Sequence, residues 1–315
     1  MDTLPVLGLG ASLSLCEEPN PLVLVEQAGG PQFIEYAGLC DVERVWADVQ
    51  PLLQRQIPVL FHPSFINFCG TLANDDHWLA MTAEHVARVQ SPWFAQDCAY
   101  CHWGAAGYSS QFGYFIGPIL NRESLDRAID RVNEVKAVVR APLLLEPPPV
   151  TYVVGSMAPL QFFGELAEAT DCGLLFDIGH LYSYELATGL STLDQLKECP
   201  VNRVAEVHVA GGKVQELDEH AMYLDAHEQT IVPEVMTLFR QCLPHFPQLK
   251  AVCFECESVS ESRVLEVLGE LRESIVECSS ANDLVAKVQE SLVIKESEIK
   301  ERAFKEGETK ECGQC

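Results

Sequence analysis

The 315-residue chain is poor in basic side chains and has no long apolar run. It has 21 Lys and Arg residues against 46 Asp and Glu, which gives a formal net charge of −25. Because proteins bind nucleic acid by setting Lys and Arg against phosphates, this balance argues against a nucleic-acid partner. No apolar stretch is long enough to cross a bilayer, and the opening MDTLPVLGLG lacks the basic region of a signal peptide. We therefore expect a cytoplasmic protein that binds neither nucleic acid nor membrane.

The usual nucleotide-binding and thiolate motifs are also missing. No GxGxxG or GxxxxGK[ST] follows an apolar run, so the common phosphate cradles are absent. The thirteen cysteines are an odd and scattered set, in a chain long enough to fold without disulfides. Two CxxC pairs, Cys98/Cys101 and Cys253/Cys256, lie in or beside apolar runs that read as strands, where side chains three positions apart face opposite ways. This arrangement disfavours chelation by thiolates, and a third pair, Cys312/Cys315, could bind metal, form a disulfide or do neither.

Eight apolar runs recur along the chain, most of them apolar throughout, as parallel strands covered on both faces should be. They occupy residues 5–10, 32–38, 58–64, 93–100, 141–148, 173–180, 204–211 and 251–258. Between them lie segments with the spacing of amphipathic helices, most clearly at residues 41–56, 77–90, 123–139, 158–170 and 233–246. This alternation predicts a TIM (β/α)8 barrel, with a doubly wound open sheet as the alternative.

The end of the chain has a different composition. It is dense in charge and loses its apolar period after Ile294. We expect a metal-dependent TIM-barrel catalytic domain over residues 1–278, followed by an acidic, helical or disordered tail over 279–315 that ends in CxxC.

Histidine and acidic residues recur at the ends of six consecutive predicted strands. They are His62, Asp97 with His102, Glu146, Asp177 with His180, His208 with Asp225 and His227 in the loop that follows, and Glu255. In a barrel these ends meet at the mouth that carries the active site. Imidazole and carboxylate donors suit iron, manganese or zinc, and cations would relieve the repulsion among the acids. The donors exceed what one ion needs, so the pattern predicts a cluster of two or three ions.

Other residues of the same types are expected outside this cluster. His77, His85 and His245 lie in helix-like segments and are expected at the surface, and His220 is expected in a loop. Glu35 ends the second predicted strand, where it could line the mouth or cap a helix.

The block LLLEPPPVTYVVGSMAPLQFFGELAEATDCGLLFDIGHLY resembles the multinuclear non-haem iron-dependent oxidative enzymes, the family that includes the catalytic subunit of methanobactin oxazolone synthase. The resemblance continues through HVAGG from His208, DAH at 225–227 and the strand carrying Glu255, and covers about residues 4–275. It implies a TIM barrel holding two or three iron ions in a mixed-valence state. With dioxygen as co-substrate, such an oxidoreductase modifies a side chain, often cysteine, of a ribosomally made peptide, commonly with a partner protein that presents the peptide.

Carried over by position, the resemblance implies roles for particular residues. Asp177 would lie in or beside the ligand shell, and Asp177 and Asp225 are predicted to be catalytic. The implied metal ligands are His62, Glu146, His180, His208, Asp225, His227 and Glu255.

The chain departs from the family pattern at three positions. Asp97 stands where the family has a histidine, so that Asp97 or His102 would complete the ligand set. His180 and Pro147 each stand where the family has an asparagine. Two alternative functions remain: a TIM-barrel hydrolase or isomerase with two or three zinc or manganese ions, and a scaffold protein with a degenerate metal site.

Overall fold

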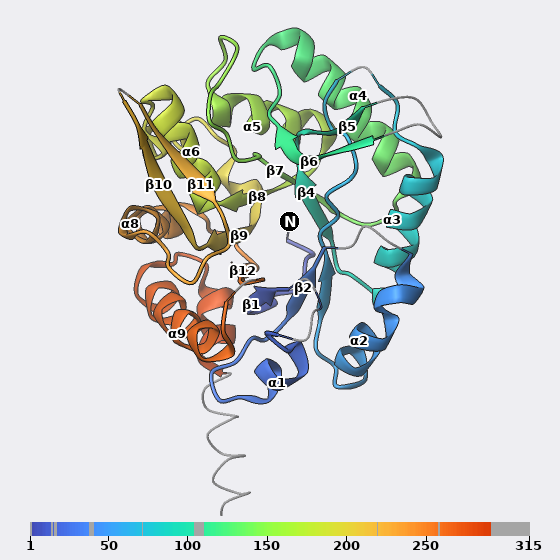
Figure 1. Cartoon of the computed structure of the whole chain (residues 1–315), viewed down its shortest axis with the longest axis vertical. Helices are drawn as coiled ribbons and strands as arrows, with labels where there is room; N and C mark the ends of the chain where they lie inside the picture. Colours follow the sequence, from blue (N-terminus) through green and yellow to red (C-terminus); the bar gives the residue numbers. More distant parts are fainter. Residues whose placement is uncertain are drawn as a thin grey trace, which may run out of the picture.

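The eight predicted strands close into one parallel barrel (Figure 1). The computed structural model describes residues 2–13, 15, 18–37, 41–70, 72–103, 110–218, 220–257 and 259–290, without the side chains of 102, 103, 110–114 and 217. Around the barrel the strand order is β1-β12-β9-β8-β7-β4-β3-β2. The prediction of a TIM barrel is therefore confirmed, and the open sheet is excluded. The barrel strands are β1 (Gly8–Ser12), β2 (Ile34–Tyr36), β3 (Val59–Phe61), β4 (Phe94–Asp97), β7 (Leu143–Glu146), β8 (Gly173–Asp177), β9 (Val204–Ala210) and β12 (Ala251–Glu255).

Helices surround the barrel, as Figure 1 shows. All five segments with clear helical spacing form helices, but the last ends earlier than its pattern suggests. There α8 stops at Cys242 and a 3-10 turn, Leu243–His245, follows, because Pro244 has no N–H to continue an α-helix. The helices are α1 (Pro21–Glu26), α2 (Val42–Gln54), α3 (Asp76–Val89), α4 (Arg122–Val138), α5 (Pro159–Thr170), α6 (Ile178–Thr188), α7 (Thr192–Gln195), α8 (Pro233–Cys242) and α9 (Glu261–Cys278).

The strands pack apolar side chains on both faces. One cluster of buried residues lies between the strands and the helices and includes Val207 and Phe176. A second and smaller cluster includes Leu60, Ala95, Leu144 and other alternate strand residues, which fill the barrel itself. Since both faces are buried, the strands read as continuous apolar runs.

The strand β8 ends three residues earlier than predicted. It stops at Asp177, and Ile178–His180 form the first turn of α6. Asp177 is the N-cap of this helix, and its Oδ1 accepts a hydrogen bond from the backbone N–H of His180 at 2.7 Å. The carboxylate satisfies an N–H that the first turn of a helix leaves without a backbone partner. The prediction that His180 ends a strand was wrong, and it instead opens a helix.

Two β-hairpins that the sequence patterns did not predict follow barrel strands. The first, β5 (Tyr100–Trp103) with β6 (Ser110–Ile116), follows β4, and the second, β10 (Gly212–Leu217) with β11 (His220–Asp225), follows β9. Both therefore leave the carboxyl end of the barrel. The placement of His220 in a loop was wrong, because it begins β11, and Asp225 ends that strand.

The described C-terminal part packs on the barrel. Residues 282–290 are helical, and Leu284 and Val288 are fully buried in the core. The backbone carbonyl of Lys287 accepts a hydrogen bond from Gln32 Nε2 at 2.9 Å. The rest of the predicted tail, with Cys312/Cys315, lies outside the described residues, so the division of the chain at residue 278 stays a prediction. Among the described residues, no helix is long and apolar enough to span a membrane.

Candidate metal centre

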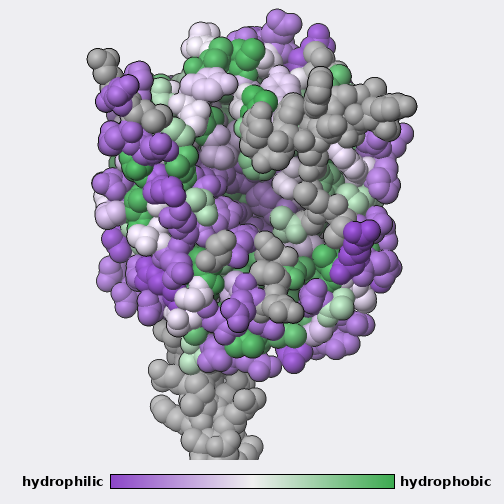
Figure 2. Space-filling view, in the orientation of Figure 1, coloured by the Kyte–Doolittle hydropathy of each residue, from purple (hydrophilic) through white to green (hydrophobic). Residues whose placement is uncertain are grey.

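The polar side chains at the mouth follow from the period of a β-strand. Side chains two positions apart on a strand face the same way. Ala95, Leu144 and Leu175 fill the barrel, so Asp97, Glu146 and Asp177, each two residues further on, line its carboxyl end. Figure 2 shows a hollow in the middle of this face, with hydrophilic residues in its depth.

Strand register brings donors from neighbouring strands side by side. Asp97 pairs with Glu146 across β4 and β7, and Asp177 pairs with His208 across β8 and β9. The ladder between β8 and β9 shifts by one residue at Ala205. This shift leaves Glu206 and His208 on the interior face of β9.

His62 joins the carboxylates of three strands. Its Nδ1 lies 3.5 Å from Glu35 Oε1, and its Nε2 lies 3.3 Å from Glu146 Oε2 and 4.0 Å from Asp97 Oδ2. All four side chains are buried or nearly so. Glu35, left open between lining the mouth and capping a helix, lines the mouth.

His180 reaches the same carboxylates from the first turn of α6. Its Nδ1 lies 3.1 Å from Glu146 Oε1 and 3.0 Å from the carbonyl oxygen of Pro147, and its Nε2 lies 3.2 Å from Asp225 Oδ2. A carbonyl can only accept, so a hydrogen bond to Pro147 uses an N–H at Nδ1. The Nε2 atom then carries a lone pair that faces Asp225, and a metal ion between the two residues could bind to it.

His208 lies at the centre of the cluster and is fully buried. Its Nε2 lies 3.1 Å from Glu35 Oε1 and 3.7 Å from Glu206 Oε1, and its Nδ1 lies 3.4 Å from Glu255 Oε1. Glu206 also accepts a hydrogen bond from Trp93 Nε1 at 2.7 Å. Sequence reasoning missed Glu206, although an acid inside an apolar strand, two residues before His208, was a usable signal.

His227 extends the cluster toward the rim, with 28% of its side chain exposed. Its Nε2 lies 3.4 Å from Asp225 Oδ2 and 3.5 Å from Glu255 Oε2. Its Nδ1 lies 2.6 Å from Glu257 Oε2, and Glu257 in turn accepts from the hydroxyl of Ser12. A carboxylate on the far nitrogen of a histidine is the usual support of a metal-binding imidazole.

Burial and neighbouring charges divide the carboxyl groups into two sets. Burial raises the pKa of Glu255, but His227 and His208 outweigh it and lower the value to about 2. Histidine neighbours likewise hold the pKa of Glu35 and of Asp225 well below the usual range against the effect of burial. Burial raises the pKa of Asp177 to about 7, despite His180. Burial and the charge of Glu146 raise the pKa of Asp97 well above its ordinary value.

The donor set fits metal ions. Within the described residues, the ion pairs of this centre join carboxylates to histidines and include no Lys or Arg, so the acids have no permanent cation. Several buried polar atoms have no hydrogen-bond partner in the described part of the chain. Leaving such groups unpaired is costly, and a divalent cation would satisfy them. The unpaired atoms include Glu35 Oε1, His62 Nδ1, Asp97 Oδ1, Glu146 Oε2, Asp177 Oδ2, both ring nitrogens of His208 and Asp225 Oδ1.

Four overlapping groups of three residues place their ligand atoms within 4.8 Å of one another. Because the groups share His62, His208 and Glu255, they form one continuous cluster with room for more than one ion. The donors suit iron, zinc or manganese alike. The groups are Glu35–His62–His208, His62–Asp97–Glu146, Asp177–His208–Glu255 and His227–Glu255–Glu257.

The structure brings together nearly all the residues predicted for the site. The exception is His102, whose backbone lies in β5 but whose side chain is outside the described part. Within the described residues, no candidate group contains a thiol, in keeping with the expectation for the two internal CxxC pairs. The residues that converge are His62, Asp97, Glu146, Asp177, His180, His208, Asp225, His227 and Glu255.

One surface prediction was wrong. His85 is fully buried behind the barrel, where its Nδ1 lies 2.8 Å from the hydroxyl of Tyr36 and its ring stacks on Phe61. The packing of α3 against β2 and β3 explains this burial. His77 and His245 are exposed, as expected.

Fold and site together define a TIM barrel with a candidate multinuclear metal centre at its mouth. Similar solved structures include a xylose isomerase domain containing protein from Salmonella typhimurium, with a TM-score of 0.57 and 10% identity, covering 87% of this chain and 99% of that one. Another is a xylose isomerase-like TIM barrel protein from Mycobacterium smegmatis in complex with magnesium, with a TM-score of 0.52 and 12% identity, covering 88% and 98%. At these identities the likeness shows the fold alone.

The chain belongs to the RiPP precursor modification enzyme family MbnB/TglH/ChrH, whose family model matches residues 38–273. It is 30% identical over 191 residues to a UPF0276 protein of Rhizobium meliloti, covering 59% of this chain and 60% of that protein. It is 25% identical over 195 residues to a UPF0276 protein of Paraburkholderia phytofirmans, covering 60% and 61%. The chain thus matches about three fifths of the length of these relatives.

Proposed function

We propose that this protein is a multinuclear iron-dependent oxidase that uses dioxygen to modify a side chain, most simply a cysteine, of a ribosomally made precursor peptide. Membership of the precursor modification family supports the class of substrate. The observation that carries the proposal is the continuous cluster of imidazoles and carboxylates at the barrel mouth. A partner protein that presents the peptide belongs to the same proposal.

In this proposal, two or three ions share the cluster. The holding residues are those carried over from the family, joined by Asp97 and, from the geometry, by Glu35. Iron held there would supply one-electron chemistry with dioxygen and would bind the thiolate of a substrate cysteine. The ligand residues are His62, Glu146, His180, His208, Asp225, His227 and Glu255.

The chain orients its donors before any ion binds. Asp177 fixes the first turn of α6 by accepting from the N–H of His180, which aims the imidazole at the cluster. Pro147 and Glu257 each engage the Nδ1 of a histidine, His180 and His227, and leave both Nε2 atoms facing Asp225. Such preorganisation removes most of the entropy cost of assembling a site.

Asp225 lies where the cluster meets solvent, with 14% of its side chain exposed. Its depressed pKa keeps it ionised at neutral pH, so it can hold a metal or accept a hydrogen bond that orients a bound substrate. Asp177 is fully buried, and burial raises its pKa to about 7, so near neutrality it can take up or release a proton beside His180. These two positions support the catalytic roles proposed for Asp177 and Asp225.

The proposal is tested by purifying the full chain without oxygen and measuring its metal content and its oxygen uptake with a cysteine-bearing precursor peptide. We expect iron at two or three equivalents and uptake of oxygen only with iron and peptide. Stoichiometric zinc or manganese with hydrolytic or isomerase activity would instead support the rival barrel enzyme, and a protein without metal would support the scaffold.

The matched variants are His208→Ala and His245→Ala. His208 is fully buried among Glu35, Glu206 and Glu255, whereas His245 is exposed on a 3-10 turn away from the mouth. The first change should lower iron content by at least one equivalent, and the second should leave it unchanged. Full iron loading in a correctly folded His208→Ala protein would refute the assignment.

A further inference from the structure

An apolar groove adjoins the metal cluster. Residues 115–120 and 149–154 line most of it, and its volume is about 500 Å³. Tyr184, Tyr223 and Leu224 complete the lining together with Asp225, whose Oδ2 also lies 3.2 Å from His180 Nε2. Asp225 is the one charged residue among the described residues that line the groove. The groove and the cluster are therefore continuous through Asp225.

The rim of this groove exposes large apolar side chains. Ile119 is 44% exposed, Val154 is 51% exposed and Tyr152 is 69% exposed. Large apolar side chains are also exposed at other places in the described part of the chain, but here three of them border one cavity. Contiguous exposed apolar surface commonly marks a binding site.

The groove also offers unpaired polar groups of the kind that a peptide chain satisfies. Within the described residues, the backbone N–H groups of Thr151, Tyr152 and Val153 donate to no protein acceptor. Peptide carbonyls are suitable acceptors for these donors, and pairing to an exposed run of backbone is a common mode of peptide recognition.

We propose that this groove binds the residues next to the modified side chain of the precursor peptide, and that it selects uncharged, apolar or aromatic residues there. The inference rests on the proposed function, since it takes the peptide as the occupant. The apolar lining supplies the selectivity, and the unpaired backbone N–H groups of residues 151–153 hold the peptide backbone. A charged neighbour of the modified residue would lose its hydration without gaining a partner.

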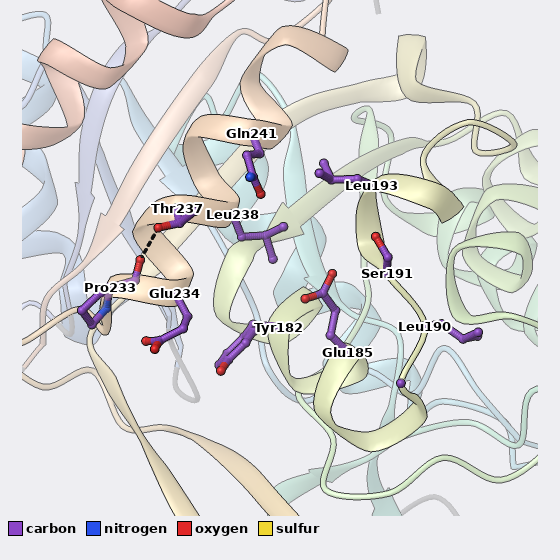
Figure 3. Close-up of a pocket in the computed structure, with 11 residues that line it drawn as sticks. Tyr182, Glu185, Leu190, Ser191, Leu193, Pro233, Glu234, Thr237, Leu238 and Gln241 are labelled. Carbon is purple, nitrogen blue, oxygen red and sulfur yellow. Dashed lines mark hydrogen bonds between the residues drawn. The ribbon is translucent and has the colours of Figure 1, made fainter.

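A second groove serves as an internal comparison (Figure 3). It lies between α6 and α8 on the outside of the barrel, has a volume of about 620 Å³ and is lined partly by Glu185 and Glu234. Among its described lining residues there is no predicted metal ligand. Leu190, at its edge, is 44% exposed, like Ile119. A substitution at Leu190 is therefore a control for the same substitution at Ile119. The two side chains are similar in size and exposure, but they lie at different grooves.

The experiment is an affinity selection with the full-length protein kept under nitrogen. The probe is a synthetic library of acetylated and amidated peptides with a central cysteine and randomised residues on both sides. Wild type, Ile119→Glu, Val154→Glu and Leu190→Glu are compared, and bound peptides are identified by mass spectrometry. The affinity of the most enriched peptide is then measured for each variant, and circular dichroism checks that each is folded.

We expect wild type and Leu190→Glu to enrich peptides with apolar or aromatic residues beside the cysteine. Ile119→Glu and Val154→Glu should each bind the best peptide about tenfold more weakly, the effect of losing one apolar contact in a specificity pocket. No apolar preference in wild type, or equal affinity in all four proteins, would overturn the inference. A loss confined to Leu190→Glu would place the peptide in the other groove and would overturn it too.

Iron content and oxygen uptake, measured on the same samples, separate this inference from the proposed function. If wild type contains iron but shows no apolar preference, the inference about the groove is wrong and the proposed oxidase function is not affected. If the protein selects apolar peptides but holds no iron, the oxidase proposal is wrong and the inference about the groove is supported.

Discussion

Asp97 lies where the family resemblance calls for a histidine, and its surroundings show what it can do there. Its carboxylate lies 4.0 Å from His62 Nε2 and 3.8 Å from His180 Nδ1, and Oδ1 has no hydrogen-bond partner in the described part of the chain. Burial and the neighbouring Glu146 raise the pKa of Asp97, so both disfavour the charged form of this carboxyl group when no cation is near it. A bound cation would favour the charged form and bind the oxygen.

Asp97→Asn is expected to lower the metal content by about one equivalent, because the amide keeps the shape but loses the charged donor. His102→Ala is expected to leave the content unchanged. Both are measured by elemental analysis of protein purified without oxygen. The reverse pattern, with loss only in His102→Ala, would show that His102 supplies the missing ligand.

The metal-free protein should lose stability as pH rises from about 6.5 to 9. Burial lowers the pKa of His62, but the carboxylate of Glu35, 3.5 Å from its Nδ1, and the charge of Glu146 outweigh burial and raise the value to about 9. The folded state therefore binds this proton more tightly than the unfolded state. The resulting stabilisation is complete below pH 6.5 and is lost through pH 9, and it is on the order of 3 kcal/mol.

Urea denaturation of chelator-treated protein at several pH values measures this effect. His62→Gln should show a shallower decline in the free energy of unfolding between pH 6.5 and 10 than wild type. Parallel profiles for the two proteins would mean that His62 carries no such proton in the folded state.

Among the elements, the hairpin β10–β11 matters most to the site, because it carries Asp225 to the mouth and is followed by His227. Sequence patterns identified the barrel strands, which are buried on both faces and read as apolar runs. They did not identify this hairpin, because GKVQEL and HAMYLD are mixed in polarity and many of their described side chains are only partly buried. Asp225 was predicted as a ligand from its residue type, but it was expected in a loop and not at the end of a strand.

The backbone turn at Gly211 holds the hairpin in place. A Cβ on Gly211 would lie 1.8 Å from the carbonyl oxygen of Glu228, whereas one on Gly269, inside α9, would meet nothing within 4 Å. Gly211→Ala should therefore displace the hairpin, lower the metal content and destabilise the protein by several kcal/mol. Gly269→Ala should stabilise it by about 0.5–1 kcal/mol, as expected for alanine in a helix.

Thermal unfolding of the two glycine variants measures their stability, and elemental analysis measures their metal content. A Gly211→Ala protein with wild-type stability and metal content would show that the close approach at this turn is not required for the site.

On the scale of the whole molecule, the barrel could be predicted because its strands read as apolar runs and the main helices have amphipathic spacing. Parallel strands joined through helices require right-handed crossovers, which leaves few possible topologies. The convergence of the ligands then follows from the barrel. Glu206 could have been predicted, because alternation along β9 puts it on the same face as His208. The contact of Glu257 with His227 could not, because Glu257 lies beyond β12, where side-chain direction depends on the loop.

The C-terminal helix over 282–290 contributes to the core of the whole barrel. Removing residues 279–315 should destabilise the protein by roughly 3–6 kcal/mol, because the buried surfaces of Leu284 and Val288 are lost and the core beneath them is exposed. Removing only 291–315 keeps this helix, so the shorter truncation should leave a more stable protein than the longer one. Equal melting temperatures for the two truncated proteins would contradict the packing of this helix.

The central claim is that donors from separate strands meet at the mouth and hold several iron ions there. It is tested most directly by X-ray diffraction at the iron absorption edge, from crystals grown and frozen without oxygen. We predict two or three anomalous peaks among His62, Glu146, His208 and Glu255. An absence of peaks in this pocket, in protein that contains iron, would contradict the account.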